Sequence, residues 1–248
     1  MNLAIDIGNT LVKTAIFKDN ELLSFSSFED LSVSVLKSLL EKNPSVENVI
    51  LSSVIIRDNS ISDFLRNGYH YVELTSETRI PIVNLYQSPH TLGNDRIACA
   101  VGANSIFPGC DVLAVDAGTC IKYDFVNSRN QYLGGGISPG IEMRFRALNN
   151  FTGKLPLVSY RYFDKLIGEN TDESILSGVM NGVAEELRGI VHRYAEQYPD
   201  VRVVFTGGYL KFFERIFNIS HTEKSSIFAD PFLVLKGLNQ ILNFNERK

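Results

Sequence analysis

The sequence of 248 residues contains no tryptophan, only three cysteines and no run of lysine and arginine. Cys99, Cys110 and Cys120 lack CxxC spacing and lie among apolar or small residues, so we expect free thiols in a reducing compartment and no zinc site. The formal charge is −4, from 24 basic and 28 acidic residues, which does not favour a nucleic-acid partner.

Long apolar runs are missing as well. No window approaches the ~20 apolar residues of a membrane span, and the first residues form a strand-like pattern instead of a basic segment followed by an apolar stretch. We therefore expect a cytoplasmic protein with no membrane partner. With 44% hydrophobic and 21% charged residues, the composition is typical of a globular protein that has a full core in one large or two small domains.

The first part of the chain, which begins with "LAIDIGNTLVKTAIF", predicts a β-meander. Apolar patterns separated by turn residues indicate strands over 3–7, 11–17 and 21–25. Helical spacing over 31–40 is followed by a strand pattern over 49–56. A further helix is predicted to begin near Gly93 and to end before Pro108.

The opening pattern returns at "VLAVDAGTCIKYDF", where Asp116 follows Asp6 by 110 residues. After it we predict a strand from 131 into "GGGISPG", helices over 141–148 and 172–195, a strand over 201–205 with a glycine turn and a helix, and a last helix over 231–242. This repeat predicts two α/β domains related by duplication, 1–110 and 111–248, with a central cleft between them.

The motifs "DIGNT" and "DAGT" each follow an apolar strand and predict two phosphate loops. Glycine lets the backbone approach a phosphate closely, Thr or Asn offers a donor, and Asp can position a metal-bound water. The alternative is that each motif is a tight hairpin with an Asp or Asn turn. Neither GxxxxGK[ST] nor GxGxxG is present, so a different nucleotide fold is required.

The two DxG motifs and the later pair Gly207-Gly208 resemble the acetate and sugar kinase, Hsp70 and actin superfamily. The resemblance implies duplicated ribonuclease-H-like (actin-like ATPase) domains that clamp ATP between the two hairpins, with the glycine pair at the adenosine. An ordinary strand-to-helix turn is the alternative explanation of "TGG".

The motifs "DIGNT", "GNDR", "DAGTC", "GGGISPG" and "GENTDESILSG" occur in the order and approximate spacing of the type III pantothenate kinases. The chain resembles this family over nearly its whole length. Two positions depart from the usual pattern: Asn94 fills the variable position of GxDR, and Cys120 stands where alanine or threonine is more usual.

The resemblance implies the ligands of each loop. The implied ATP-binding residues are Asp6, Gly8, Asn9, Thr10 and Lys13 in the first loop and Thr119 in the second. Asp116 resembles the ligand of a monovalent cation, potassium or ammonium. Mg²⁺ is expected to arrive with ATP, because it usually keeps several waters and few protein ligands.

A kinase for a small alcohol needs a group that receives the hydroxyl proton and cations that offset the phosphoryl charge. The resemblance implies that Asp95 is this base, and a helix N-terminus favours an ionised carboxylate. Arg96 is expected to hold the anionic end or a polar oxygen of the substrate. The alternatives are a helix-capping role for Asp95 and a surface salt bridge for Arg96.

The resemblance also implies a pantothenate pocket and a homodimer. The implied pocket residues are Tyr86, Gly93, Asn94, Asp95, Arg96 and Thr171. Tyr86 could instead be a core aromatic residue, and Thr171 fits an N-cap of the helix over 172–195, a role that is compatible with substrate contact. The apolar stripe of that helix suits either a dimer interface or simple core.

The function implied by the resemblance is ATP-dependent phosphorylation of pantothenate to 4'-phosphopantothenate, the first step of coenzyme A biosynthesis. One alternative keeps the nucleotide site and uses another small alcohol or acid as acceptor. A second alternative is a non-catalytic nucleotide-binding regulator, which the presence of Asp6, Asp95 and Asp116 disfavours.

Overall fold

The computed structural model describes residues 1–55, 59–217 and 226–246. The chain forms two compact units. Unit 1 comprises Met1–Gly109, Val126–Gly134 and Phe232–Lys248, and unit 2 comprises Cys110–Phe125 and Gly135–Pro231. The two domains expected from the sequence, 1–110 and 111–248, are contiguous segments, whereas unit 1 also contains the segment Val126–Gly134 and the last helix.

Unit 1 contains a five-stranded sheet in the order β3-β2-β1-β4-β5. Its strands are β1 (Asn2–Ile7), β2 (Val12–Lys18), β3 (Glu21–Phe28), β4 (Asn48–Ser53) and β5 (His70–Glu73). The first three form an antiparallel meander, and β4 and β5 extend it in parallel on the other side of β1. The predicted meander is therefore confirmed. Ile56, the expected end of the next strand, lies outside the described residues.

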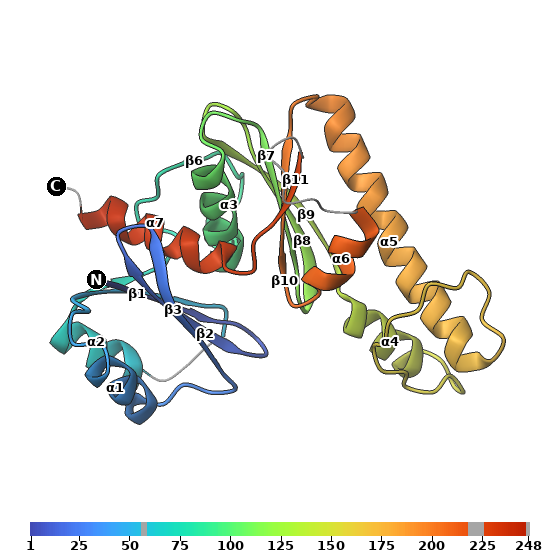
Figure 1. Ribbon diagram of the computed structural model, residues 1–248, viewed down its shortest axis with the longest axis horizontal. Coiled ribbons are helices and arrows are strands. Elements are labelled where there is room, and N and C mark those ends of the chain that lie inside the picture. The colour runs from blue at the N-terminus through green and yellow to red at the C-terminus, as the bar shows by residue number, and fades with distance from the viewer. Residues whose placement is uncertain (56–58, 218–225, 247–248) are drawn as a thin grey trace. The chain divides into compact units, whose positions relative to one another are not determined.

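Helices cover both faces of this sheet (Figure 1). They are α1 (Val33–Glu41) and α2 (Ser60–Gly68) on one face and α3 (Asn94–Ile106) and α7 (Leu233–Glu246) on the other. Side chains alternate between the faces of a strand, so Leu3 and Ile5 of β1 join the core under α1 and α2 while Ala4 joins the core under α3 and α7. The helix predicted near Gly93 is confirmed as α3.

Helix α7 belongs to unit 1 because it packs closely on α3 and on β1. A Cβ atom at Gly237 would lie 1.8 Å from the carbonyl oxygen of Ala98, so the two backbones touch at this crossing. The buried amide of Asn2 donates hydrogen bonds to Asn239 Oδ1 at 2.9 Å and to Asn243 Oδ1 at 2.7 Å. Neither interaction can be read from the sequence near α7.

Replacing Gly237 with alanine is expected to lower the stability of unit 1 by about 1–3 kcal/mol, because α7 must move away from α3. This corresponds to a decrease of about 2–12 °C in Tm, measured by circular dichroism. Gly178 is the matched control, since it lies inside helix α5 (Thr171–Gln197) with open space at its Cβ position. Gly178→Ala should leave Tm unchanged or raise it, and equal Tm changes in both variants would contradict the close packing.

The second sheet has the order β11-β10-β7-β8-β9-β6. Its strands are β7 (Val112–Ala117), β8 (Cys120–Val126), β9 (Gln131–Pro139), β10 (Arg202–Gly207), β11 (Ile227–Ala229) and the short β6 (Val83–Asn84). The order β9-β8-β7-β10-β11 in this sheet corresponds to β3-β2-β1-β4-β5 in the first sheet. Strand β10 is parallel to both β7 and β11. The duplication predicted from the repeated motifs is thus present in the strand order.

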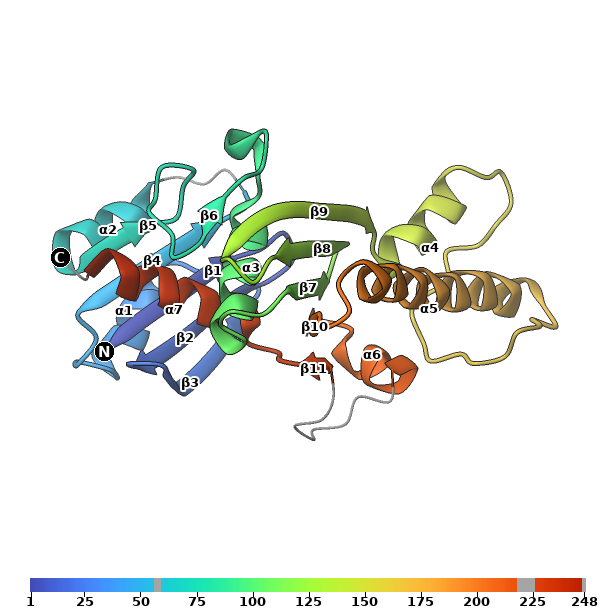
Figure 2. The same cartoon turned by 90° about the horizontal axis from the view of Figure 1, so that it is seen from above.

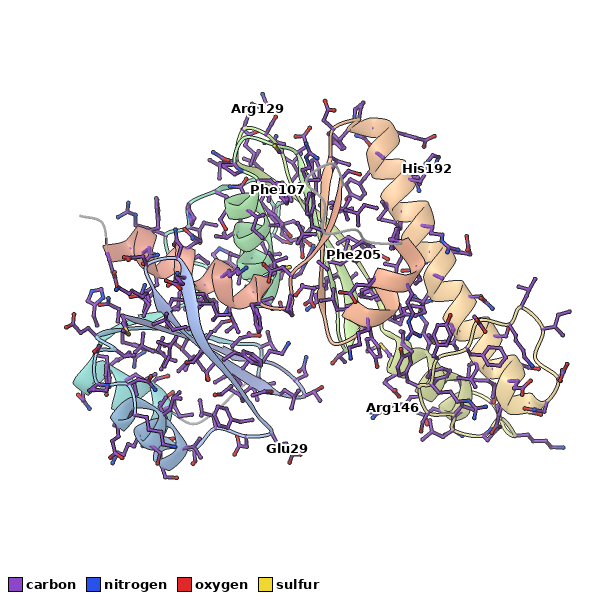
Figure 3. The ribbon with its side chains drawn as sticks, in the orientation of Figure 1. Glu29, Phe107, Arg129, Arg146, His192 and Phe205 are labelled. Carbon is purple, nitrogen blue, oxygen red and sulfur yellow. The ribbon has the colours of Figure 1, made fainter. Side chains whose placement is uncertain are left out.

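Three helices of unit 2 pack together on one side of β7, β8 and β10 (Figure 2). They are α4 (Ile141–Asn150), α5 and α6 (Leu210–Phe217). Phe205 of β10, labelled in Figure 3, places its ring 5.2 Å from that of Phe213 and 4.8 Å from that of Phe217. In the described part of the chain, no helix is long and apolar enough to span a bilayer.

Candidate active site

The first predicted phosphate loop is the turn between β1 and β2 in unit 1. The Gly8 N–H donates to the Leu11 carbonyl at 3.1 Å and closes the turn, which leaves Asn9 and Thr10 exposed. Asp6, near the end of β1, is paired in the strand register with Lys13 of β2. The structure therefore brings together all five residues predicted for this loop.

The second predicted loop is the turn between β7 and β8 in unit 2. The Gly118 N–H donates to the Cys120 carbonyl at 3.0 Å, and the Thr119 carbonyl accepts from Gly140 N–H at 3.1 Å. Gly140 ends the "GGGISPG" motif, so this motif supports the loop directly. Because strand β7 ends at Ala117, Asp116 and Thr119 lie at the carboxyl edge of the sheet, where ligands bind in many α/β proteins.

The glycine pair lies at the same edge of unit 2. Strand β10 is parallel to β7, with Thr206 opposite Asp116 and Gly207 opposite Ala117. Gly207 has φ = +102°, and a Cβ atom there would lie 2.3 Å from the Ala117 carbonyl oxygen. Only glycine fits this contact without strain. Gly207 therefore fixes the end of β10 beside the second loop, which an ordinary strand-to-helix turn would not require.

Asp116 forms an ion pair within the second hairpin. Its Oδ2 atom lies 2.6 Å from Nζ of Lys122 on β8, and both side chains are largely buried. The family resemblance implies a bound monovalent cation at Asp116, but the structure places the Lys122 ammonium group there. Because Lys122 already balances the charge of the Asp116 carboxylate, this carboxylate is a poor ligand for a second cation. Sequence reasoning misses Lys122 because its pairing with Asp116 depends on the strand register, and "CIKYDF" carries two charged residues, Lys122 and Asp124, so it does not single out Lys122.

Arg96 and Tyr86 lie together in unit 1. The guanidinium carbon of Arg96 is 5.5 Å from the centre of the Tyr86 ring, and Arg96 is only 5% exposed. The Tyr86 ring also lies 6.1 Å from that of Tyr132. Arg96 is thus buried and not a surface residue, and its guanidinium group makes a cation–π contact with the Tyr86 ring. Tyr86 is partly a core residue, as the alternative explanation suggested.

Asp95 lies in the first turn of α3, immediately before Arg96. Its Oδ1 atom accepts a hydrogen bond of 2.9 Å from the Arg96 N–H, and the side chain is partly exposed. The carboxylate lies at the N-terminal, positive end of the helix dipole. Gly93 is the N-cap residue, and Asn94 donates from Nδ2 to the Leu74 carbonyl at 2.7 Å. The "GNDR" motif is therefore a rigid helix start that presents a carboxylate.

Thr171 is the first residue of α5 in unit 2, and it does not cap the helix. The N-cap is Asn170, whose side chain accepts a hydrogen bond of 3.0 Å from the Glu173 N–H. The capping role considered for Thr171 is therefore wrong by one position. Its contact with pantothenate stays a prediction.

A partly buried polar network in unit 2 connects the "GGGISPG" strand with α5. The Tyr123 hydroxyl donates to Glu186 at 2.9 Å, and Arg144 donates to Glu186 and, at 2.9 Å, to Ser138. Burial raises the pKa of Tyr123, and its bond to Glu186 raises it further. Burial would raise the pKa of Glu186 as well, but the hydrogen bonds that it accepts, first that from Arg144, lower it overall. No local sequence signal predicts this network.

Among residues 1–55, 59–217 and 226–246, no group of three or more His, Cys, Asp and Glu side chains is placed to hold a metal ion. The loops offer mainly backbone N–H and hydroxyl donors, which suit the oxygens of a phosphate chain. A divalent ion that is bound chiefly by the phosphates themselves would need few protein ligands.

Two halves with the same strand order, each with an aspartate–glycine hairpin at the carboxyl edge of its sheet, define the duplicated ribonuclease-H-like fold of the acetate and sugar kinase, Hsp70 and actin superfamily. The fold is similar to that of the activator of 2-hydroxyisocaproyl-CoA dehydratase from Clostridium difficile with bound ADPNP, with a TM-score of 0.55 and 14% identity over 99% of this chain and 94% of the other.

The chain belongs to the type III pantothenate kinase family, whose sequence model matches residues 2–193. A type III pantothenate kinase of Christiangramia forsetii is 43% identical over 99% of both chains. Another, of Phocaeicola vulgatus, is 44% identical over the full length of both. The family predicted from the motifs is therefore confirmed.

Proposed function

We propose that this chain transfers the γ-phosphoryl group of ATP to the terminal hydroxyl of pantothenate and forms 4'-phosphopantothenate, the first step of coenzyme A biosynthesis. The observation that carries the proposal is the start of α3, where Asp95 precedes a buried Arg96 that is held against Tyr86. This cluster offers a base and a fixed cation to a small anionic alcohol, in a chain of the type III pantothenate kinase family.

The proposed ATP contacts lie on both hairpins and on the glycine turn. Those of unit 1 are Asp6, Gly8, Asn9, Thr10 and Lys13, and those of unit 2 are Thr119, Gly207 and Gly208. Backbone N–H groups and hydroxyls of these turns would hold phosphate oxygens, and Mg²⁺ would enter as part of the Mg–ATP substrate. In this proposal the chain has two halves. The first half, 1–110, supplies one phosphate loop and the GxDR motif, and the second half, 111–248, supplies the other phosphate loop. The repeated strand order supports this division.

In the proposed reaction Asp95 accepts the proton of the pantothenate hydroxyl as the phosphoryl group is transferred. Because the transition state is loose, Asp95 also orients the hydroxyl for in-line attack. Arg96 binds the carboxylate or a polar oxygen of pantothenate, and Tyr86, Gly93, Asn94 and Thr171 complete the pocket.

The proposal also gives the protein a cytoplasmic location and a homodimeric state. Cys99, Cys110 and Cys120 form no disulfide, which suits a reducing compartment. Helix α5 spans 27 residues and is the candidate interface element.

The test is production of ADP from Mg–ATP by the purified protein, with and without pantothenate. We expect ADP to form only when pantothenate is present, together with a phosphorylated product of matching mass. Turnover with another small alcohol but not with pantothenate would show that the phosphoryl acceptor is that alcohol. Tight ATP binding without phosphoryl transfer to any such alcohol would indicate that the protein is a nucleotide-binding regulator and not a kinase.

A further inference from the structure

Lys122 and Asp116 form an ion pair in the second phosphate hairpin that is largely withdrawn from solvent. The Nζ–Oδ2 distance is 2.6 Å, and the two side chains are 15% and 14% exposed. Ions in solution screen such a pair only weakly, and separating its members would leave both charges desolvated. The ion pair is therefore expected to stay formed in the folded hairpin.

The strands of unit 2 place both side chains on the same face of the sheet. Val115 and Ala117 on β7, and Ile121 and Tyr123 on β8, all belong to the core under α4, α5 and α6. Side chains alternate along a strand, so Asp116 and Lys122 lie on the opposite face from this core. Lys122 is thus directed to the aspartate by the register of the hairpin.

A lysine side chain ends in an ammonium group, which has the charge of a free ammonium ion and three N–H donors where that ion has four. A second monovalent cation at Asp116 would meet the like charge of Lys122 at close range. We propose that the Lys122 ammonium group takes the place of the monovalent cation predicted beside Asp116, so that nucleotide binding by this chain does not depend on potassium.

The first hairpin provides a related arrangement. Asp6 is opposite Lys13 in the register of β1 and β2, so each loop has a lysine on the strand that follows it. At each loop the chain itself supplies a cation near the aspartate. This arrangement suits a site that receives Mg²⁺ with the nucleotide and has lysine ammonium groups of its own beside both phosphate loops.

The inference rests on the proposed function in that it assumes a nucleotide at the second loop. The test measures the Kd of the Mg complex of ATP by calorimetry, in potassium chloride and in tetramethylammonium chloride at equal ionic strength. The proteins are wild type, Lys122→Met and the control Lys154→Met, which removes an exposed lysine of the same unit.

For the wild type and for Lys154→Met we expect Kd values within about twofold in the two salts. Lys122→Met should bind about tenfold more weakly in tetramethylammonium chloride, and potassium should restore most of its affinity. Restoration by potassium is a result that a purely structural role of Lys122 would not produce. An equal loss in both salts would overturn the proposal.

The wild type alone also decides the question if Lys122→Met does not fold. Binding that weakens about tenfold without potassium, or saturable binding of thallium(I) seen by thallium NMR, would overturn the proposal. Pantothenate-dependent ADP production is measured in the same buffers. Nucleotide binding without turnover would reject the proposed function and still leave the salt comparison decisive, whereas no nucleotide binding in either salt would reject both.

Discussion

Asp95→Asn is expected to lower kcat by about 10²- to 10⁴-fold, because the amide cannot accept the proton of the substrate hydroxyl. Asparagine has nearly the same shape, and its side-chain oxygen can still accept the hydrogen bond from the Arg96 N–H. The start of α3 should therefore stay intact. Steady-state kinetics give kcat and KM, and calorimetry should show that the Kd for Mg–ATP changes little.

The matched control is Asp63→Asn, which removes another aspartate from the first turn of a helix in unit 1. Asp63 lies on α2, and its side chain is 64% exposed and pairs with Arg66 at 3.7 Å. We expect normal kcat and Tm for this variant, because exposed ion pairs contribute little to stability. Full turnover by Asp95→Asn would refute its assignment as the base.

Gly207→Ala should weaken both nucleotide binding and the stability of unit 2. The backbone has φ = +102°, and the new Cβ atom would lie 2.3 Å from the Ala117 carbonyl oxygen. The conformation alone costs about 1–3 kcal/mol in a non-glycine residue. The end of β10 must also move away from the second loop, so we expect a Kd for Mg–ATP raised by about tenfold or more. Calorimetry and thermal unfolding measure the two effects.

Gly208→Ala separates the two effects of the glycine pair, because a Cβ atom at Gly208 meets nothing within 4 Å. Its Tm should stay close to that of the wild type, so a change in Kd for this variant would report a direct contact with the nucleotide. A normal Tm and a normal Kd for Gly207→Ala would show that the tight approach to Ala117 has no functional role.

The hairpins and the long helices were predictable because their signals are local. In "DIGNT" and "DAGT" an apolar strand, a turn glycine and a second strand follow one another directly, and both turns form as expected. The start of α3 was also predictable, since Gly93 and Asp95 carry the N-terminal signals themselves. The residues that form each hairpin turn can therefore be identified from the sequence alone.

The sequence analysis makes no prediction for α2, β5 and β6, and the two strands depend on distant partners. Strand β5 is ordered by its parallel pairing with β4, and β6 has two residues that pair with the start of β9. The stacking of Arg96 on Tyr86 likewise joins segments that are apart in the chain. The ion pair of Lys122 depends on a strand register that the sequence pattern does not state.

The packing of α7 on the first sheet has a consequence for the synthesis of the protein. The ribosome makes β1 to β5 early, but α7, which covers one face of that sheet together with α3, comes near the end of the chain. Until α7 emerges, Ala4 and Ile50 on that face lack their final cover, and the amide of Asn2 lacks its partners. The sheet of unit 1 is thus synthesised first but reaches its final packing only when α7 has been made. The nascent chain must avoid aggregation until then.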